Sequence, residues 1–307
     1  MTDVQRISGV LSPVVTPFDS NLCPDGKKLV RQCRWLLDND VGLAVFGTNS
    51  EANSLSLVEK MTLLSTLVES GIPGARMMPG TGCCSISESV ELTRHAVNLG
   101  CAGTLMLPPF YYKGVSDEGL FRNYSEIIQR VGDSRLRIYL YHIPPVAQVP
   151  ISMGLIERLL KEYPGTIAGV KDSSGDWSNT QQMLEQFQPE GFDVFAGSET
   201  FLLQVLRAGG AGCISATANV NPGPIATLNK TWQQADADDQ QAALDAVRAI
   251  FQDYVMIPAL KAAVAHYSST PDWITLRPPL VELNESQRAD LVNKLDAAGF
   301  TMPGLAA

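Results

Sequence analysis

The sequence of 307 residues predicts an α/β fold, a (β/α)8 TIM barrel that continues into a C-terminal helical extension. Short apolar runs rich in β-branched residues alternate with segments whose apolar residues recur at helical spacing. About eight strand–helix pairs follow one another, which is the order typical of this barrel. Two further helical patterns follow the eighth pair, and the barrel itself does not require them.

The predicted strands are apolar runs that end at glycine, proline or polar turn residues. The second ends in the turn of residues 47–51, and the sixth ends at Lys171, just before the turn residues 172–175. In chain order the strands are predicted at residues 9–16, 43–48, 76–80, 103–108, 137–143, 167–171, 193–197 and 212–216.

The helices are predicted from apolar residues spaced three or four positions apart. Some of their starts carry a capping serine with acidic residues in the first turn, as at Ser85 with Glu88 and at Ser116 with Asp117. The barrel helices are predicted at residues 27–39, 57–69, 87–99, 118–130, 153–162, 179–188, 200–208 and 226–234, and the helices of the extension at residues 245–268 and 285–298.

Residues 1–225 are predicted to form the barrel that carries the active site, and residues 226–307 the last barrel helix and the extension. No Gly/Ser-rich linker divides the chain. A doubly wound open sheet is the competing architecture, but it generally uses fewer units and a glycine-rich first turn. The first turn here, residues 16–19, reads Thr-Pro-Phe-Asp, so the barrel is the predicted architecture.

The charge balance excludes some classes of partner. The chain has a net charge of −9, a pI of about 4.9 and no basic run, so nucleic acid and anionic membrane surfaces would be repelled. No stretch resembles a signal peptide, and none has the roughly 18 consecutive apolar residues of a membrane span. We therefore expect a soluble, cytoplasmic protein that binds neither nucleic acid nor membrane.

Neither the histidines nor the cysteines predict a metal site. His95, His142 and His266 lack the spacing of zinc ligands, and the six cysteines form no Cys-x-x-Cys pair. We expect no metal, no cofactor and reduced thiols. His142 follows Tyr141 in a predicted strand, so its side chain should point to the opposite face and pack there without a catalytic role.

Polar residues close three of the predicted strands, where a barrel of this kind carries its reactive groups. The second strand ends in the turn of residues 47–51, the fifth at Tyr141 and the sixth at Lys171. The fifth and sixth strands are neighbours in a barrel, so the phenol of Tyr141 should lie close to the amine of Lys171. An amine among apolar residues has few groups to solvate its charged form, which favours a free amine able to form a Schiff base. The alternative is an ordinary lysine that pairs with a carboxylate such as Asp172.

Seven motifs in this order resemble those of the dihydrodipicolinate synthase and N-acetylneuraminate lyase superfamily of class I, Schiff-base aldolases. The resemblance covers nearly the whole chain and is carried by residues 12–18, 47–51, 108–112, 141–144, 169–175, 196–198 and 212–219. It implies a barrel enzyme that acts on a small 2-oxo acid such as pyruvate.

The resemblance also implies the roles of individual residues. Lys171 would form the Schiff base with the C2 ketone of a 2-oxo acid, while Tyr141 would shuttle a proton with Thr48 as its hydroxyl relay. The turn of Gly47, Thr48 and Asn49 would bind the substrate carboxylate through backbone N–H groups. The remaining substrate-binding residues would be Ser173, Gly197, Ile214 and Tyr112. In the synthase branch the matching tyrosine crosses a dimer interface, which implies a homo-oligomer here, a dimer or a tetramer.

The sequence departs from the synthase branch at two places. Asn49 stands where that branch has a second threonine, and an amide cannot relay a proton as a hydroxyl does. The synthase branch also has an arginine shortly after the proline that follows the fifth strand. That arginine holds the carboxylate of aspartate semialdehyde. Residues 144–148 here read Pro-Pro-Val-Ala-Gln, and a guanidinium clamp has no easy substitute.

We therefore expect reversible cleavage of a 2-oxo-3-deoxy acid, of the sugar-acid type, to pyruvate and an aldehyde. Asn49, Gln148, Ser173 and Ser174 suit substrate hydroxyls better than a second carboxylate. The alternatives are a dehydratase, a deaminase or a 4-hydroxy-2-oxoglutarate aldolase of the same family, because the same lysine and tyrosine serve all of them. Dihydrodipicolinate synthase activity is disfavoured by the missing arginine. The alternative outside catalysis is a silent 2-oxo-acid binder on the same barrel.

Overall fold

The computed structural model describes residues 6–305, which separate into two compact units. Unit 1 contains the described residues 6–9 together with Pro73–Ile214, and unit 2 contains Val10–Ile72 together with residues 215–305. Within the described residues, no helix combines the length and apolarity needed to cross a membrane.

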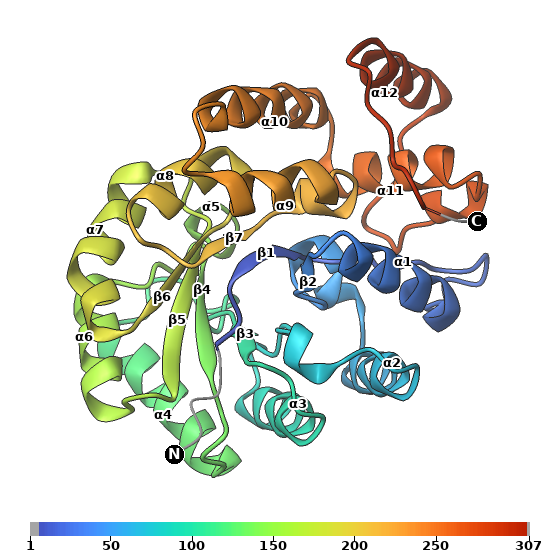
Figure 1. Ribbon diagram of the computed structural model, residues 1–307. Helices are drawn as coiled ribbons and strands as arrows, with labels where there is room; N and C mark the ends of the chain where they lie inside the picture. Colours follow the sequence, from blue (N-terminus) through green and yellow to red (C-terminus); the bar gives the residue numbers. More distant parts are fainter. Residues whose placement is uncertain (1–5, 306–307) are drawn as a thin grey trace. The chain divides into compact units, whose positions relative to one another are not determined.

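Unit 1 is built on a parallel sheet whose strands pair in chain order (Figure 1). Its strands are β3 (Thr104–Met106), β4 (Ile138–His142), β5 (Ile167–Asp172), β6 (Asp193–Ala196) and β7 (Gly212–Ile214). Its α-helices are α3 (Ile86–Asn98), α4 (Asp117–Val131), α5 (Pro144–Ala147), α6 (Met153–Glu162), α7 (Trp177–Phe187) and α8 (Leu202–Arg207). Strands and helices alternate along the chain, as predicted.

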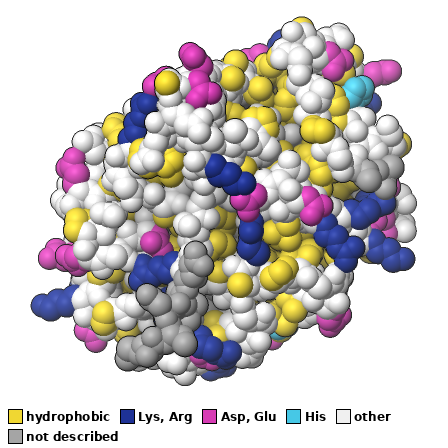
Figure 2. All heavy atoms as spheres, in the orientation of Figure 1, with side chains coloured by type: hydrophobic (Ala, Val, Ile, Leu, Met, Phe, Trp, Pro, Cys, Tyr) yellow, Lys and Arg dark blue, Asp and Glu magenta, His cyan; other side chains and the backbone are white. Residues whose placement is uncertain are grey.

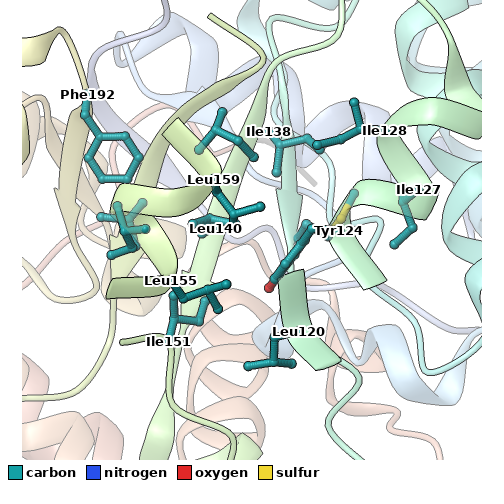
Figure 3. Close-up of a cluster of buried hydrophobic side chains, with 14 of the residues drawn as sticks. Leu120, Tyr124, Ile127, Ile128, Ile138, Leu140, Ile151, Leu155, Leu159 and Phe192 are labelled. Atoms are coloured by element: carbon teal, nitrogen blue, oxygen red, sulfur yellow. The ribbon is translucent and has the colours of Figure 1, made fainter. Parts of the chain in front are cut away.

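A hydrophobic cluster joins the sheet of unit 1 to its helices. Ile138 and Leu140 of β4 pack with side chains of α4 and α6, among them Tyr124 and Leu155 (Figure 3). Side chains alternate between the two faces of a strand, so the residues between these, Tyr139 and Tyr141, point to the other face. Burial of one face against the helices therefore fixes which side chains β4 presents on its opposite face.

Unit 2 combines an N-terminal and a C-terminal stretch of the chain. The strand β1 (Gly9–Ser12) begins at Gly9, which closes the N-terminal segment of unit 1. It pairs in parallel with β2 (Gly42–Leu43), with Leu11 opposite Gly42 and Ser12 opposite Leu43. The α-helices are α1 (Gly26–Asp38), α2 (Leu57–Glu69), α9 (Pro222–Thr231), α10 (Ala237–Gln252), α11 (Met256–Tyr267) and α12 (Glu285–Ala297).

Two of the predicted elements are wrong. Residues 76–80 were expected to form the third strand, but the segment makes only isolated bridges, at Met77 and at Gly80, which lies opposite Leu105. Pro79 has no N–H group to donate, so a full ladder cannot form there. The long helix predicted at residues 245–268 is instead two helices, α10 and α11, separated after Gln252. Pro258, in the first turn of α11, is tolerated at a helix start but not in the middle of a continuous helix.

Charged side chains of both signs are interspersed on the face of the molecule in Figure 2, without one dominant basic patch. This distribution agrees with the net charge of −9.

Candidate functional site

Lys171 lies on β5 directly opposite Tyr141 on β4. Its amine, Nζ, is 3.2 Å from the phenolic oxygen of Tyr141 and 4.3 Å from the centre of that ring. Both residues are buried, each 3% exposed. The structure therefore brings together the amine and the phenol that the sequence predicted to be neighbours.

An aromatic layer lies beside this pair on the same face of the sheet. Lys171 pairs with Phe195 of β6, and the ring of Phe195 packs edge-to-face on that of Tyr139, with 5.8 Å between the centres. Gly169, opposite Tyr139, leaves room for its ring, because a Cβ atom there would lie 2.8 Å from it. Tyr139 and Phe195 were not among the predicted site residues, although strand alternation could have placed both on the face of Lys171. Aromatic side chains thus fill the face of the sheet on which Lys171 lies.

Asp172 does not pair with Lys171, which removes the alternative of an ordinary ion pair between them. Its carboxylate accepts hydrogen bonds from the Ser174 N–H group at 2.9 Å, from Asn179 Nδ2 at 2.9 Å and from the Thr180 hydroxyl at 2.6 Å. These bonds hold the loop after β5 and the first turn of α7. Asp172 therefore supports the site from the opposite face of the strand.

His142 is the buried, packed histidine that the sequence predicted. Its Nδ1 atom accepts a hydrogen bond from the Ile151 N–H group at 3.0 Å, which keeps Nδ1 unprotonated. Burial lowers the pKa of His142 below its ordinary 6.5, and the charge of Asp172 acts in the opposite direction. The imidazole is therefore a neutral part of the packing beneath the loop.

Three of the predicted substrate-binding residues lie at the ends of neighbouring strands. Ser173 follows β5, Gly197 follows β6 and Ile214 is the last residue of β7. The Ser173 N–H group donates to the His142 carbonyl, and the Gly197 N–H group donates to the Asp172 carbonyl, both at 2.7 Å. Ser173 lies so close to Gly197 that a Cβ atom on the glycine would be 2.1 Å from the serine Oγ. Ile214 is fully buried at the end of β7. The structure brings Ser173 and Gly197 into contact through a position that only glycine can fill.

Tyr112 differs from these residues because it is exposed. It lies in the loop after β3 with 58% of its surface accessible, and its ring meets that of Tyr111 edge-to-face at 5.5 Å between centres. The Tyr111 side chain is even more exposed, at 76%. Two adjacent exposed tyrosines form an apolar surface on the single chain.

The turn of Gly47, Thr48 and Asn49 belongs to unit 2, where Thr48–Ser50 forms one 3₁₀ turn. The Gly47 N–H group donates to the Ser50 hydroxyl at 3.2 Å, and the Thr16 hydroxyl donates to the Ser50 carbonyl at 2.7 Å. Gly47 thus uses its N–H group within the turn, so we expect it to contribute shape rather than a hydrogen bond to a ligand. Thr48 and Asn49 are half-buried.

The chain is similar to a family of known proteins over nearly its whole length. The model of the dihydrodipicolinate synthetase family matches residues 6–298. An uncharacterised DapA-like lyase of Chloroflexus aurantiacus is 32% identical over 286 residues, which cover 92% of this chain and 94% of that protein. A 4-hydroxy-tetrahydrodipicolinate synthase of Methanococcoides burtonii is 30% identical, over 95% of this chain and 98% of its own.

Solved structures share the fold. The dihydrodipicolinate synthase of Agrobacterium tumefaciens superposes with a TM-score of 0.87 at 30% identity, over 94% of this chain and 99% of its own. YagE of Escherichia coli K12, crystallised with pyruvate, superposes with a TM-score of 0.86 at 24% identity, over 95% and 99% of the two chains. These similarities confirm the predicted α/β class, a TIM barrel with C-terminal helices.

Proposed function

This chain belongs to the dihydrodipicolinate synthetase family and is a carbon–carbon lyase of the class I aldolase type, and we propose that it cleaves a 2-oxo-3-deoxy acid reversibly to pyruvate and an aldehyde. The observation that carries the proposal is the buried amine of Lys171, 3.2 Å from the Tyr141 hydroxyl. That pair supplies a nucleophile and a proton-transfer group at adjacent positions on two strands.

Lys171 starts the reaction as a nucleophile. Its neutral Nζ attacks the C2 ketone of the substrate, one proton is taken up and water leaves, which gives an iminium ion. The C3–C4 bond then breaks, its electron pair moves toward the iminium nitrogen, and the C4 hydroxyl loses its proton as the aldehyde forms. The enamine is protonated at C3, and water releases pyruvate and regenerates the amine.

Tyr141 moves the protons in this scheme. We propose that its phenolic oxygen accepts the proton of the C4 hydroxyl and returns a proton to C3, with Thr48 as the relay that the family resemblance implies. The same resemblance assigns the substrate carboxylate to the turn of Gly47, Thr48 and Asn49. Ser173, Gly197 and Ile214 line the lysine pocket in this proposal.

The segment after Tyr141 supports a hydroxylated substrate rather than one with a second carboxylate. Helix α5 covers Pro144–Ala147, and it ends at Gln148, an exposed residue with a φ of 53°. No cationic side chain lies in this stretch. An amide can bind a hydroxyl as donor or acceptor, but it cannot replace the paired charge of a guanidinium on a carboxylate.

Borohydride trapping tests the covalent step. Incubation with pyruvate and sodium borohydride should add one reduced pyruvyl group, detected by intact mass and mapped to Lys171 by peptide analysis. Lys171→Ala should show no adduct and no turnover while it keeps its far-ultraviolet circular dichroism spectrum. Absence of an adduct in the wild type would reject the lyase mechanism and favour the silent 2-oxo-acid binder.

A substrate panel tests the choice of acid. Pyruvate release should be fastest from 2-oxo-3-deoxy sugar acids and slower from 4-hydroxy-2-oxoglutarate, with aspartate semialdehyde plus pyruvate as the opposing assay. Efficient condensation of the semialdehyde would overturn the argument from the missing arginine and support the synthase activity for which several relatives are named. Loss of water or ammonia without C–C cleavage would instead identify a dehydratase or deaminase.

We also propose that the protein works in the cytoplasm as a homo-oligomer, a dimer or a tetramer, with Tyr112 at an interface between copies. The exposure of Tyr111 and Tyr112 supports this assignment, because adjacent exposed aromatic side chains are typical of protein contact surfaces.

A further inference from the structure

Glu51, the residue that follows the turn of residues 47–50, takes part in a buried ion pair. The Nζ atom of Lys261, on α11, is 2.7 Å from Oε1 of Glu51, and neither side chain has any exposed surface. The two residues are 210 positions apart in the sequence. A segment of the C-terminal extension therefore reaches the residue that follows the turn.

Arg277 completes the contacts of the Glu51 carboxylate. Its backbone N–H group donates to Oε2 of Glu51 at 3.1 Å, so both carboxylate oxygens are bound by the C-terminal stretch. The Arg277 guanidinium extends away to bind Glu59 and the Ser54 carbonyl, with Nη1 at 2.9 and 2.6 Å. The Lys261 amine and the Arg277 guanidinium also lie over the ring of Phe18, at 4.6 and 4.8 Å from its centre.

The backbone of Glu51 is held in an unusual conformation. Its φ is 56°, in the left-handed region that side-chain-bearing residues rarely adopt, and its N–H group donates to the Thr48 carbonyl at 3.2 Å. Such a conformation is unfavourable by itself and persists where the surrounding contacts hold the backbone in place. The contacts of the Glu51 carboxylate with Lys261 and Arg277 are surroundings of that kind.

Stability alone does not explain this arrangement. A buried ion pair loses the hydration of both groups, and replacement by apolar residues is frequently neutral or stabilising. Burial lowers the pKa of Lys261, and the charge and hydrogen bond of Glu51 oppose that shift, so Glu51 helps to keep the Lys261 amine charged. What the pair does supply is a fixed position for Glu51.

We propose that Glu51 is a positioning residue, held by Lys261 and Arg277, that fixes the turn of residues 47–50 in the shape that receives the substrate carboxylate. The inference rests on the proposed function and adds to it a role for the C-terminal extension. It separates binding of the carboxylate, which depends on the turn, from formation of the Schiff base, which depends on Lys171.

Two ketones distinguish this role from a general effect on folding. Pyruvate carries the carboxylate, whereas its neutral methyl ester presents the same ketone without that charge. The half-saturating concentration for borohydride trapping is measured with each compound by intact mass. The variants are Lys261→Met and the double variant Glu51→Gln with Lys261→Met, which leaves no lone buried charge and carries the test if the single variant does not fold.

We expect the half-saturating concentration of pyruvate to rise by about tenfold in both variants, because small displacements of binding groups are costly. That of methyl pyruvate should stay within roughly twofold, since Lys171 is untouched. Lys294→Met is the matched control: it breaks an ion pair with Asp253 at 3.0 Å in the same extension, but at an exposed site, and should change neither value.

Two results would overturn the inference: a folded double variant with unchanged half-saturation by pyruvate, or a parallel rise for both ketones in all folded variants. The second result would show that the ion pair acts only on the structure as a whole. An absent adduct in the wild type would reject the proposed function itself, so the two failures are distinguishable.

Discussion

Adjacent residues at the end of β5 perform different tasks because they face opposite sides of the sheet. Lys171 meets the Tyr141 hydroxyl at 3.2 Å, while Asp172 binds Ser174, Asn179 and Thr180 on the other side. The sequence predicted the neighbourhood of Lys171 and Tyr141, because parallel strands consecutive in the chain align their ends. It did not predict the partners of Asp172, since these depend on how α7 packs.

Tyr141→Phe should separate Schiff-base formation from proton transfer. The variant keeps the ring beside Lys171 but loses the oxygen, so we expect turnover to fall by about 10²–10⁴-fold, the usual contribution of a general acid–base group. Trapping of pyruvate by borohydride should persist. Steady-state rates and intact mass measure the two properties, and a variant with wild-type turnover would remove Tyr141 from the mechanism.

Gly197→Ala should disturb the site through a steric contact. The added methyl group would lie 2.1 Å from the Ser173 Oγ and 2.8 Å from the Asp172 carbonyl oxygen, so the loop after β5 must move. We expect lower thermal stability and a lower rate of trapping.

Gly154→Ala provides the control for that substitution. Its nearest neighbour would be 3.9 Å away, in the helix α6, where alanine is favoured over glycine by roughly 0.5–1 kcal/mol. Thermal melts of both variants test the argument, which fails if the two shift in the same direction.

In β4, packing of one face against the helices determines which side chains lie on the opposite face. Ile138 and Leu140 lie in the hydrophobic cluster with the helices, and His142 continues the same face at the end of β4. His142 follows Tyr141 and lies opposite Asp172. The neutral histidine is therefore part of the support for the loop that carries Ser173.

His142 should make the stability of the fold depend on pH. Its folded pKa lies below its ordinary 6.5, so the unfolded chain binds the extra proton first as the pH falls. Stability should be unaffected by this group above pH 6.5 and should decline as the pH drops from there toward the folded pKa. His142→Gln, which retains an acceptor for the Ile151 N–H group, should flatten that decline.

Melting temperatures between about pH 5 and 7.5 measure this effect in the wild type and the variant. His266→Gln, at an exposed site, controls for the substitution. If the wild type and His142→Gln lose stability in parallel over that range, another group is responsible.

Sequence patterns located most helices and missed features set by single residues. The predictions at residues 57–69 and 153–162 coincide with α2 (Leu57–Glu69) and α6 (Met153–Glu162), where capping serines precede amphipathic segments. The predictions of the third strand and of the long helix failed because of Pro79 and Pro258. Their missing N–H groups interrupt a ladder or a continuous helix even where the apolar spacing favours one. The role of Glu51 was not predictable, because its partner lies 210 residues away.

At the scale of the whole molecule, the exposed apolar side chains indicate where copies of the chain can meet. Tyr111 and Tyr112 are adjacent, whereas Val281, 73% exposed, lies in the C-terminal stretch. We expect the wild type to sediment as a dimer or tetramer of 33.2 kDa chains. Introduction of a charge at Tyr111 and Tyr112 should therefore weaken the assembly.

Sedimentation velocity of the double variant Tyr111→Glu with Tyr112→Glu tests this expectation, and Val281→Glu is the control for an added charge elsewhere. A shift toward monomer only in the tyrosine variant supports an interface there. A wild type that is monomeric at all accessible concentrations would reject both the homo-oligomer and the shared role of Tyr112.

The division of the barrel and its extension at residues 225 and 226 stays a prediction. The two compact units divide the chain at other positions. Val10–Ile72 associates with the C-terminal stretch, and Pro73–Ile214 forms most of the other unit. A contiguous segment can complete its own contacts early, whereas a unit assembled from distant segments must close a long loop.

Because unit 2 combines distant segments of the chain, its contacts can form only late in synthesis. A ribosome adding roughly 5–20 residues per second needs about 10–40 s to travel the 210 residues from Glu51 to Lys261. Throughout that interval the carboxylate of Glu51 has neither its lysine nor Arg277, and the strand bearing Lys171 is made partway through it. A nascent chain would therefore contain Lys171 before Lys261 and Arg277 can hold Glu51. We expect it to bind substrate only after the C-terminal segment has been made.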